Sequence, residues 1–371
     1  MHIDEISEII LGLILKLKER NEGLVSELWI DNKIISETRN KYISINYTDL
    51  IVQAKILLSK ENDEKRRDYL SKLITSLEYQ LGNIKIDDLI QFYKNTIDFE
   101  LKPLSDIKVN SLHEDLIRLE KDFQMDRHQV LKDASVAPDK LLEIFKQYLK
   151  IYKNRLPDYL NTEGNFDYEV VSEAPWGAFN SHVAPYKSKL TLNSAVGITT
   201  FDLKHFAVHE AYGGHHTELC FKDKLLVESN RGEHGFVLVY SPQVFISEGI
   251  AEAAFELFGY AQDFTIQEKI INAYQNLSFA LTNKAVFMYY NDKESKEKIE
   301  TYIDSFNMGK IGKQNITSFV FDPVFGKYPA IYLSAKEFVL SLYKNAKDKK
   351  PFLLDIYKNP CTPTRLIQKY S

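Results

Sequence analysis

Hydrophobic positions recur at helical spacing through the first 155 residues of the chain. The pattern is clearest in residues 3–17, in residues 62–81 and in a segment that begins at Pro138. The first segment has isoleucine or leucine at positions 3, 6, 10, 13 and 17, and the second ends at Gly82. The third can begin at its proline, because a proline at the first helical position removes no intrahelical hydrogen bond. We therefore predict that helices dominate this half of the chain.

The pattern changes between residues 160 and 200, where glycines and prolines separate short runs of β-prone residues. Two such runs are residues 168–171 and residues 189–193, both rich in β-branched, aromatic or leucine side chains. Helical periodicity returns at Phe201 and continues nearly to the end, and we expect a loop around residues 309–329. The sequence thus predicts a small sheet between two helical stretches.

The predicted fold class is mainly α, with a small β element ahead of a histidine-rich segment. The chain is expected to divide into an N-terminal helical region, residues 1–160, and a second region, residues 161–371, or to form one continuous domain. Its 371 residues are 44% hydrophobic and 27% charged, which is the composition of an ordinary globular protein. That composition excludes a disordered chain and a collagen-like rod.

The net charge and the number of cysteines limit the binding partners and the cellular compartment that we expect for this protein. The 47 basic and 52 acidic residues give a net charge of -5, so we expect no nucleic-acid partner. Cys220 and Cys361 alone imply no disulfide framework. Asp4, Glu5 and Glu8 precede the first apolar run, where a signal peptide would be basic, and no apolar stretch approaches the ~18 residues that span a bilayer. We expect a soluble, cytoplasmic protein without a membrane partner, and the oligomeric state stays open.

Four of the nine histidines lie within twelve residues, at positions 205, 209, 215 and 216. Zinc peptidases place two imidazoles on one face of a helix, with a glutamate directly after the first histidine as the general base. His209 and Glu210 supply the first half of that arrangement. The cluster therefore predicts a metal site in which His209 is a ligand.

The second imidazole can come from His215 or from His216. On a straight helix at ~100° per residue, His215 lies about 240° from His209 and His216 about 20° from it. The two glycines at positions 213 and 214 could interrupt the helix and turn His215 back toward His209, which is the alternative we prefer. On a continuous helix, His216 would share the face of His209. A pair of His205 and His209 ranks last, because Glu210 would then follow the second ligand.

A carboxylate ligand is expected from the segment that follows Ser247. Glu248, Glu252 and Glu256 recur there every four residues among small and apolar side chains. If this helix is buried, its charges need partners. Glu248 bound to a metal, with Glu252 accepting a hydrogen bond from a ligating imidazole, would satisfy both groups. The alternative is a helix whose acids face water or pair with lysines.

At these residues the sequence resembles the uncharacterised-domain family numbered 885, whose members are grouped with the gluzincin-type zinc metallopeptidases. The family motif is His-Glu, two variable residues, then Pro-Gly-His-His, and residues 209–216 read His-Glu-Ala-Tyr-Gly-Gly-His-His. Residues 190–193 are similar to its extended segment with asparagine, residues 248–251 to its Glu-Gly-x-Ala motif, and residues 328–338 to its closing helix with a tyrosine. The resemblance covers roughly residues 165–345.

The resemblance implies a helical, zincin-like architecture and a hydrolase that cleaves peptide bonds with one Zn²⁺. The two imidazoles and Glu248 would hold the ion, and Glu210 would be the general base. Tyr332, at the place of the family's tyrosine, would donate a hydrogen bond to the developing oxyanion, or would be a packed core residue. Asn193 could let an extended peptide add to a sheet edge, or could form a turn.

Two other functions fit the same residues. Two histidines and one carboxylate also describe the iron site of non-haem oxygenases. The third reading is a catalytically inactive protein that binds a metal or a peptide, because glycine stands at position 213 where the family motif has proline.

Overall fold

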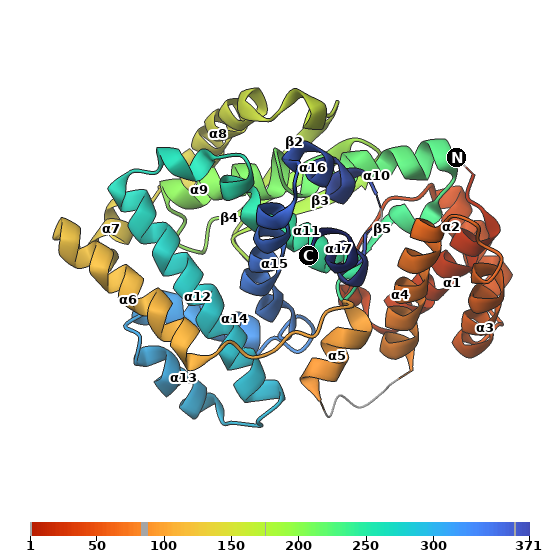
Figure 1. The fold of residues 1–371 in the computed structure, drawn as a ribbon, viewed down its shortest axis with the longest axis horizontal. Coiled ribbons are helices and arrows are strands. Elements are labelled where there is room, and N and C mark those ends of the chain that lie inside the picture. Colours follow the sequence, from red (N-terminus) through yellow and green to blue (C-terminus); the bar gives the residue numbers. More distant parts are fainter. Residues whose placement is uncertain (1, 83–87, 175, 360) are drawn as a thin grey trace.

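The computed structural model describes residues 2–82, 88–174, 176–359 and 361–371, and over them the fold is mainly helical with two small sheets (Figure 1). This confirms the predicted fold class. The helices of the first half are α1 (Glu5–Arg20), α2 (Asn32–Tyr42), α3 (Tyr47–Leu58), α4 (Glu64–Leu81), α5 (Leu89–Thr96), α6 (Asp106–Phe123), α7 (Arg127–Asp133) and α8 (Leu141–Arg155). Those of the second half are α9 (Thr200–Phe206), α10 (His215–Ser229), α11 (Pro242–Leu257), α12 (Ile266–Tyr290), α13 (Lys296–Asp304), α14 (Gly309–Val320), α15 (Ile331–Asn345), α16 (Lys349–Lys358) and α17 (Pro363–Tyr370).

The three helices predicted in the first half are present. α1 is the central element of the N-terminal group and packs against α2, α3 and α4, which lie together at one end of the molecule (Figure 1). Its predicted apolar stripe is buried. The second predicted helix is α4, and Gly82 caps its C-terminus as expected. At the third, Pro138 opens a short 3₁₀ turn and the α-helix α8 follows from Leu141.

The predicted small sheet is also present and consists of β2 (Asn165–Val171), β3 (Ala178–Ala184) and β4 (Lys187–Asn193). β4 is the central strand, parallel to β2 and antiparallel to β3. A second, two-stranded sheet pairs β1 (Val25–Leu28) with β5 (Phe236–Leu238) in antiparallel fashion. This second sheet joins the N-terminal helices to the chain just ahead of α11.

The centre of the molecule is the packing of α11 against α15. Residues of α11 are buried along almost its whole length, and a Cβ on Gly249 would lie 2.6 Å from the carbonyl oxygen of Ala335 in α15. Glycine therefore allows these two helices to approach closely. The largest apolar cluster runs from Leu89 to Leu366 and takes side chains from both sides of residue 160. The division at that residue stays a prediction.

The loop expected around residues 309–329 is wrong in its first half, where the structure has the helix α14. Gly312, Ile316 and Val320 form the buried face of this helix at four-residue steps. Gly312 does not break the helix, because its missing side chain makes room for the hydroxyl of Tyr274, which a Cβ would meet at 2.0 Å. The absence of a side chain at Gly312 is thus a packing requirement.

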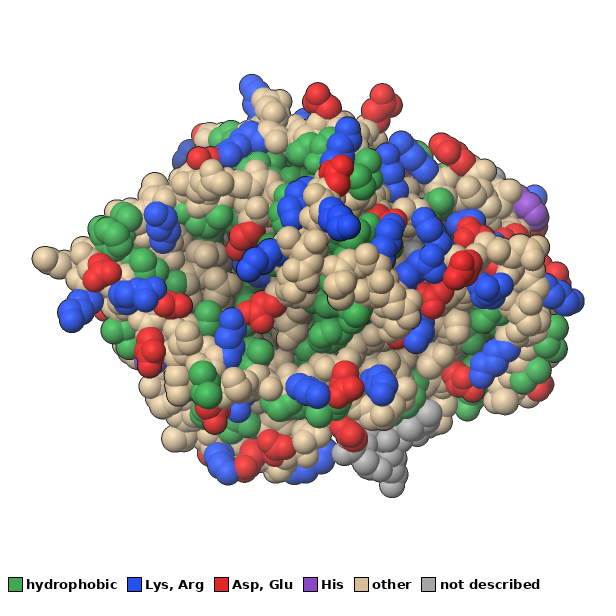
Figure 2. All heavy atoms as spheres, in the orientation of Figure 1, with side chains coloured by type: hydrophobic (Ala, Val, Ile, Leu, Met, Phe, Trp, Pro, Cys, Tyr) green, Lys and Arg blue, Asp and Glu red, His purple; other side chains and the backbone are tan. Residues whose placement is uncertain are grey.

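The surface carries both signs of charge side by side. On the face in Figure 2, basic and acidic side chains alternate without a broad area of one sign, in keeping with the near balance of 47 basic and 52 acidic residues. Within the described part of the chain, no helix is both long and apolar enough to cross a lipid bilayer.

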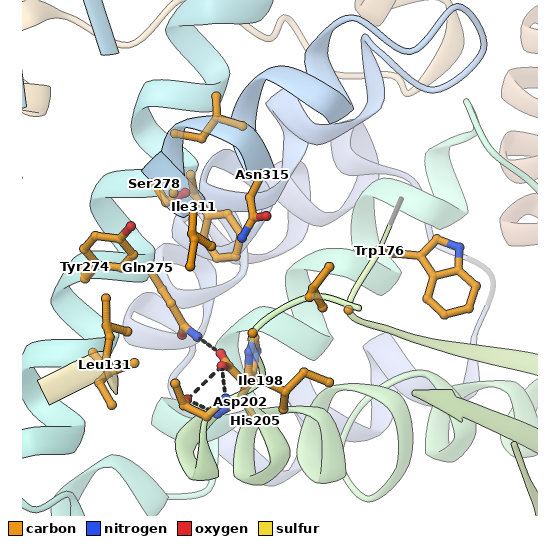
Figure 3. A pocket seen from close by; sticks show the side chains of 18 of the residues that line it. Leu131, Trp176, Ile198, Asp202, His205, Tyr274, Gln275, Ser278, Ile311 and Asn315 are labelled. Carbon is orange, nitrogen blue, oxygen red and sulfur yellow. Dashed lines mark hydrogen bonds between the residues drawn. The ribbon is translucent and has the colours of Figure 1, made fainter. Parts of the chain in front are cut away.

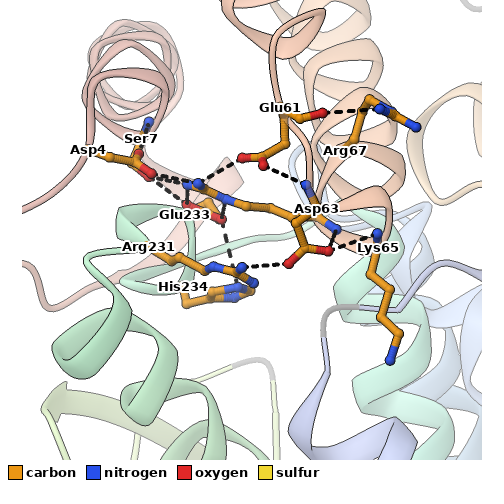
Figure 4. A network of polar contacts seen from close by, with 10 residues as sticks. Asp4, Ser7, Glu61, Asp63, Lys65, Arg67, Arg231, Glu233 and His234 are labelled. Carbon is orange, nitrogen blue, oxygen red and sulfur yellow. Dashed lines mark hydrogen bonds and ion pairs between the residues drawn. The ribbon is translucent and has the colours of Figure 1, made fainter.

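A buried cluster of charges fixes the N-terminal helices to the rest of the protein (Figure 4). The guanidinium of Arg66 on α4 lies 2.7 Å from the carboxylate of Glu233, whose side chain is fully buried. Arg66 also contacts Asp4, at 2.6 Å, and Glu61, at 3.0 Å. Because Asp4 caps α1 and Glu233 lies just before β5, one guanidinium holds three separate segments together.

Replacing Arg66 with alanine should lower the free energy of unfolding by about 3–5 kcal/mol, because Glu233 would keep a buried charge without its guanidinium. Denaturant titration measures this change. Arg67→Ala is the matched control, since Arg67 is exposed and donates only to the backbone carbonyl of Glu61, and its effect should stay within about 0.5 kcal/mol. Equal stability of the Arg66 variant and the unaltered protein would contradict this account.

Candidate metal centre

His209 and Glu210 lie in a π-helical turn, Ala207–Ala211, which directly follows α9. α9 itself begins with a capping box in which Thr199 and Asp202 satisfy each other's backbone N–H groups. Single π-helical turns are rare in proteins and occur often at functional sites. His209 is 8% exposed and Glu210 is 7% exposed, so the turn places both side chains in the interior beside a cavity.

The glycine pair after this turn ends the helix, as the sequence predicts. Gly213 has a φ of +111°, which disfavours any residue with a side chain. At Gly214 a Cβ would lie 1.7 Å from the carbonyl oxygen of His209. The chain therefore doubles back tightly, and α10 starts at His215 in a new direction. As a result, the rings of His209 and His215 lie with their centroids 4.7 Å apart.

α11 brings two carboxylates to these imidazoles. His209 Nε2 lies 3.6 Å from Glu248 Oε2, and His215 Nε2 lies 3.6 Å from Glu248 Oε1. On the other side of the ring, His209 Nδ1 lies 3.2 Å from Glu252 Oε1. One ligand atom from each of His209, His215 and Glu248 falls within 4.8 Å of the others, so this buried group could bind a metal ion.

The donor atoms fit a divalent ion. Glu248 Oε2 is buried and has no hydrogen-bond partner among the described residues, so a group that needs a partner faces the two imidazoles. Zinc binds imidazole nitrogen and carboxylate oxygen at about 2.0–2.2 Å in a tetrahedron, which puts neighbouring ligand atoms roughly 3.3–3.6 Å apart. The separations of 3.6 Å are near that value.

The electrostatics of the group also call for a cation. Burial raises the pKa of Glu248 to about 7, although His209 and Tyr328 oppose the rise. Burial works against a charged His209, but Glu210, Glu252 and Glu248 together raise its pKa to about 10. Three buried carboxylates thus surround His209, with His205 and Lys336 as further partners of Glu252 alone, and a divalent cation would balance the negative charge that remains.

A second set of residues has a similar geometry. His205, His209 and Glu252 also bring one donor atom each within 4.8 Å, and His205 Nε2 lies 3.6 Å from Glu252 Oε2. His209 belongs to both sets, so one metal at the first set leaves Glu252 to orient the far side of its ring. This is the place predicted for Glu252.

His216 does not belong to either set, so the structure brings together His209 and His215 and not His209 and His216. His216 Nδ1 lies 2.7 Å from the hydroxyl of Ser188, which in turn lies 3.1 Å from His182 Nδ1, and His182 Nε2 lies 2.8 Å from Asp223. The reason is the break at the glycine pair, because on the new helix residue 216 lies about 100° around the axis from residue 215 and contacts Ser188 instead. This network is buried away from the two cavities described below.

Asn193 is placed differently from the prediction that it binds substrate at a sheet edge. It ends the central strand β4, is fully buried, and donates to the carbonyl oxygens of Ala174 and Trp176 at 2.8 and 3.0 Å. Its side-chain oxygen accepts from the backbone N–H of Ala195. These bonds match the alternative of a turn former.

Sequence reasoning missed two groups that contact the candidate ligands. The hydroxyl of Tyr328 donates to Glu248 Oε1, and the hydroxyl of Ser247 lies 3.0 Å from His215 Nδ1. The hydroxyl of Ser247 also donates to Glu218, a fully buried carboxylate that pairs with Lys222. Tyr328 could have been found because it precedes Tyr332 by one helical turn. Ser247 and the Glu218 behind it gave no signal in the sequence.

Two cavities meet at His209 and Glu210. The larger, about 640 Å³, extends between α9, α12 and α14 (Figure 3). The smaller, about 390 Å³, extends toward β1 and β5 and is also lined by His215 and Glu248. Tyr332 lines both cavities. Burial and the charges of Glu248, Glu252 and Glu210 hold the pKa of Tyr332 well above its usual range, so its hydroxyl stays a proton donor.

The comparisons with known proteins show a similarity of fold only. No family model and no curated protein matches the chain significantly. A solved structure described as "the putative lipoprotein from Colwellia psychrerythraea" is similar over 91% of this chain, with a TM-score of 0.56 and 14% identity. The chain spans 62% of the length of that protein. A structure described as "The Structure of CHT" is 11% identical, covers 99% of this chain and 93% of its own, and has a TM-score of only 0.34.

Gly214→Ala should lower metal affinity about 10- to 100-fold, because its Cβ would push against the carbonyl of His209 and turn that ligand away. Metal content after dialysis at a fixed free-metal concentration measures the change. The control is Gly197→Ala, where a Cβ meets nothing within 4 Å and metal binding should be unaffected. If the two variants bind metal equally, the tight turn does not position His209.

Proposed function

We propose that this protein is a zinc-dependent hydrolase that cleaves peptide bonds. The observation that carries the proposal is the convergence of His209, His215 and Glu248 beside Glu210, at the junction of two cavities. Catalytic zinc sites in hydrolases have three protein ligands and leave one position for water. A buried ligand set open to cavities on two sides is what such an enzyme needs to receive an extended chain.

The motifs behind the sequence resemblance meet at this one place. Three of the matched motifs supply residues to the wall of the smaller cavity. These residues are His209, Glu210 and His215 from the first motif, Glu248 from the second and Tyr332 from the third. This convergence supports the proposal that the chain belongs to the uncharacterised-domain family numbered 885. At position 213, where the family motif has proline, Gly213 adopts a φ of +111° that proline cannot adopt, so the backbone of this turn departs from the one that the family motif would form.

Each residue of the candidate site has a definite task in this proposal. His209, His215 and Glu248 would hold the ion, which when bound lowers the pKa of a water molecule toward about 7. The carboxylate of Glu210 accepts the proton of the attacking water and passes it to the nitrogen of the leaving amine. Asn180 steadies the turn that carries this base, since its side-chain amide donates to the carbonyl oxygen of Glu210 at 2.5 Å.

Tyr332 and Tyr328 have separate tasks. The hydroxyl of Tyr332, at the junction of the cavities, would donate a hydrogen bond to the carbonyl oxygen as it gains negative charge. The hydroxyl of Tyr328 is occupied by Glu248 and instead fixes the orientation of that carboxylate.

Glu210→Gln should lower kcat for peptide hydrolysis about 10²- to 10⁴-fold while the bound metal stays at the level of the unaltered protein, because the substitution removes a proton acceptor and no ligand. Peptide-library digestion and elemental analysis of the same preparation measure the two quantities. A variant that cleaves at the original rate would exclude Glu210 as the base. An unaltered protein that binds metal and cleaves no peptide would favour the binding function.

Glu248→Ala should abolish stoichiometric metal binding, whereas His205→Asn should leave most of it, because only the first set of donors includes Glu248. Elemental analysis of protein purified without chelator gives both the amount and the identity of the metal. Loss of metal from the His205 variant alone would move the ion to the second set. Iron in place of zinc, with turnover that needs oxygen, would point to the oxygenase alternative.

A further inference from the structure

Glu27 is a buried carboxylate on the wall of the smaller cavity, far in sequence from the candidate ligands. It lies on β1, where the register with β5 shifts between Val25 and Glu27. Such a bulge redirects side chains of the strand. The side chains of Val25, Glu27 and Val237 all line the cavity, which also reaches Glu210 and Glu248. The N-terminal region, in which the sequence signalled only scaffold, thus contributes a charged group to the candidate site.

No cation of the described chain balances Glu27. The residue is 9% exposed, and its Oε2 accepts a hydrogen bond of 2.8 Å from the backbone N–H of His182. Within the described residues it has no ion pair with lysine, arginine or histidine and belongs to neither set of potential metal donors. Burial and the nearby charge of Glu210 raise the pKa of Glu27 to about 8. A buried carboxylate in this state is stabilised by any cation that enters the cavity.

The rest of the cavity wall agrees with a cationic occupant. Apart from Glu210 and Glu248, whose charge His209 and the metal would balance, its acidic members are Glu22 and Glu27, against a single lysine, Lys18. The remaining wall is largely apolar, with valines of β1 and β5 and with Phe325. A ligand that carries one compact positive charge next to an apolar portion therefore fits the wall of this cavity better than an anion does.

We propose that the smaller cavity is a subsite for an ammonium group of the substrate, with Glu27 as its counter-ion. The inference rests on the proposed peptidase function and specifies it: the ammonium is either the free N-terminus of a peptide or the side chain of a lysine within it. Glu27 then selects substrates by their charge, next to the residues that act on the peptide bond.

Titration calorimetry on metal-loaded Glu210→Gln protein tests this binding without turnover. The probes are trialanine amide, N-acetyl-trialanine amide and N-acetyl-Ala-Lys-Ala amide, which differ in the presence and the place of one ammonium group. At least one charged probe should bind about tenfold or more tightly than the neutral one. Preference for the first identifies the N-terminus as the occupant, and preference for the third identifies a lysine side chain. Equal affinity for all three overturns the proposal.

Glu27→Gln, added to the same protein, should reduce that preference about tenfold while metal content and melting temperature stay unchanged, because glutamine still accepts the hydrogen bond from His182. The matched control is Glu22→Gln, an exposed carboxylate on the wall of the same cavity, which should keep the preference. A preference that survives in the Glu27 variant would overturn the role of Glu27.

The outcomes also separate this inference from the function on which it rests. Cleavage of all three peptides by the unaltered protein with equal KM would overturn the subsite and leave the peptidase proposal intact. An ammonium preference in a protein that cleaves none of the peptides would support the subsite and overturn the peptidase.

Discussion

The candidate metal centre depends on one close approach of the backbone to itself. The chain at Gly214 passes so near the carbonyl of His209 that no side chain fits between them, and Gly213 supplies the positive φ that the reversal requires. This contact ends one helix and starts another with only three residues between them, so that two imidazoles from different helices face one glutamate of α11. The hydroxyl of Tyr357, which donates to the carbonyl of Gly213, holds the turn from the C-terminal part of the chain.

Much of the fold could be predicted because it follows from local spacing. The apolar stripes of α1 and α4 and the run that became β4 lie in single segments, and each element formed close to its predicted bounds. α14 escaped prediction because Gly312 is required by the close approach of Tyr274 from another helix. Local propensity gives no information about such a contact.

The candidate site likewise has residues that local spacing predicted and residues that only tertiary packing brings in. His209, Glu210, Glu248 and Glu252 stood out by their spacing, and the structure brings them together. The choice between His215 and His216 turned on the backbone angles of two glycines, which the sequence allowed but did not determine. For Asn193 both a sheet edge and a turn stayed open because strand order cannot be read from one strand, and β4 proved to be central. Glu27, Glu218 and Tyr328 reach the site only through tertiary packing.

The network around His216 shows a limit of recognising hydrolases by the distances between their side chains. His182 lies within hydrogen-bond distance of Ser188 on one side of its ring and of Asp223 on the other. This order of serine, histidine and aspartate resembles the nucleophile, base and orienting acid of serine esterases. Here the serine hydroxyl is fully enclosed and also engaged by a second imidazole, so neither an ester nor an organophosphate inhibitor has a path to it. A search for catalytic triads by interatomic distance alone would therefore select these three side chains in this protein. Solvent access to the serine hydroxyl distinguishes a catalytic triad from a buried structural network of this kind.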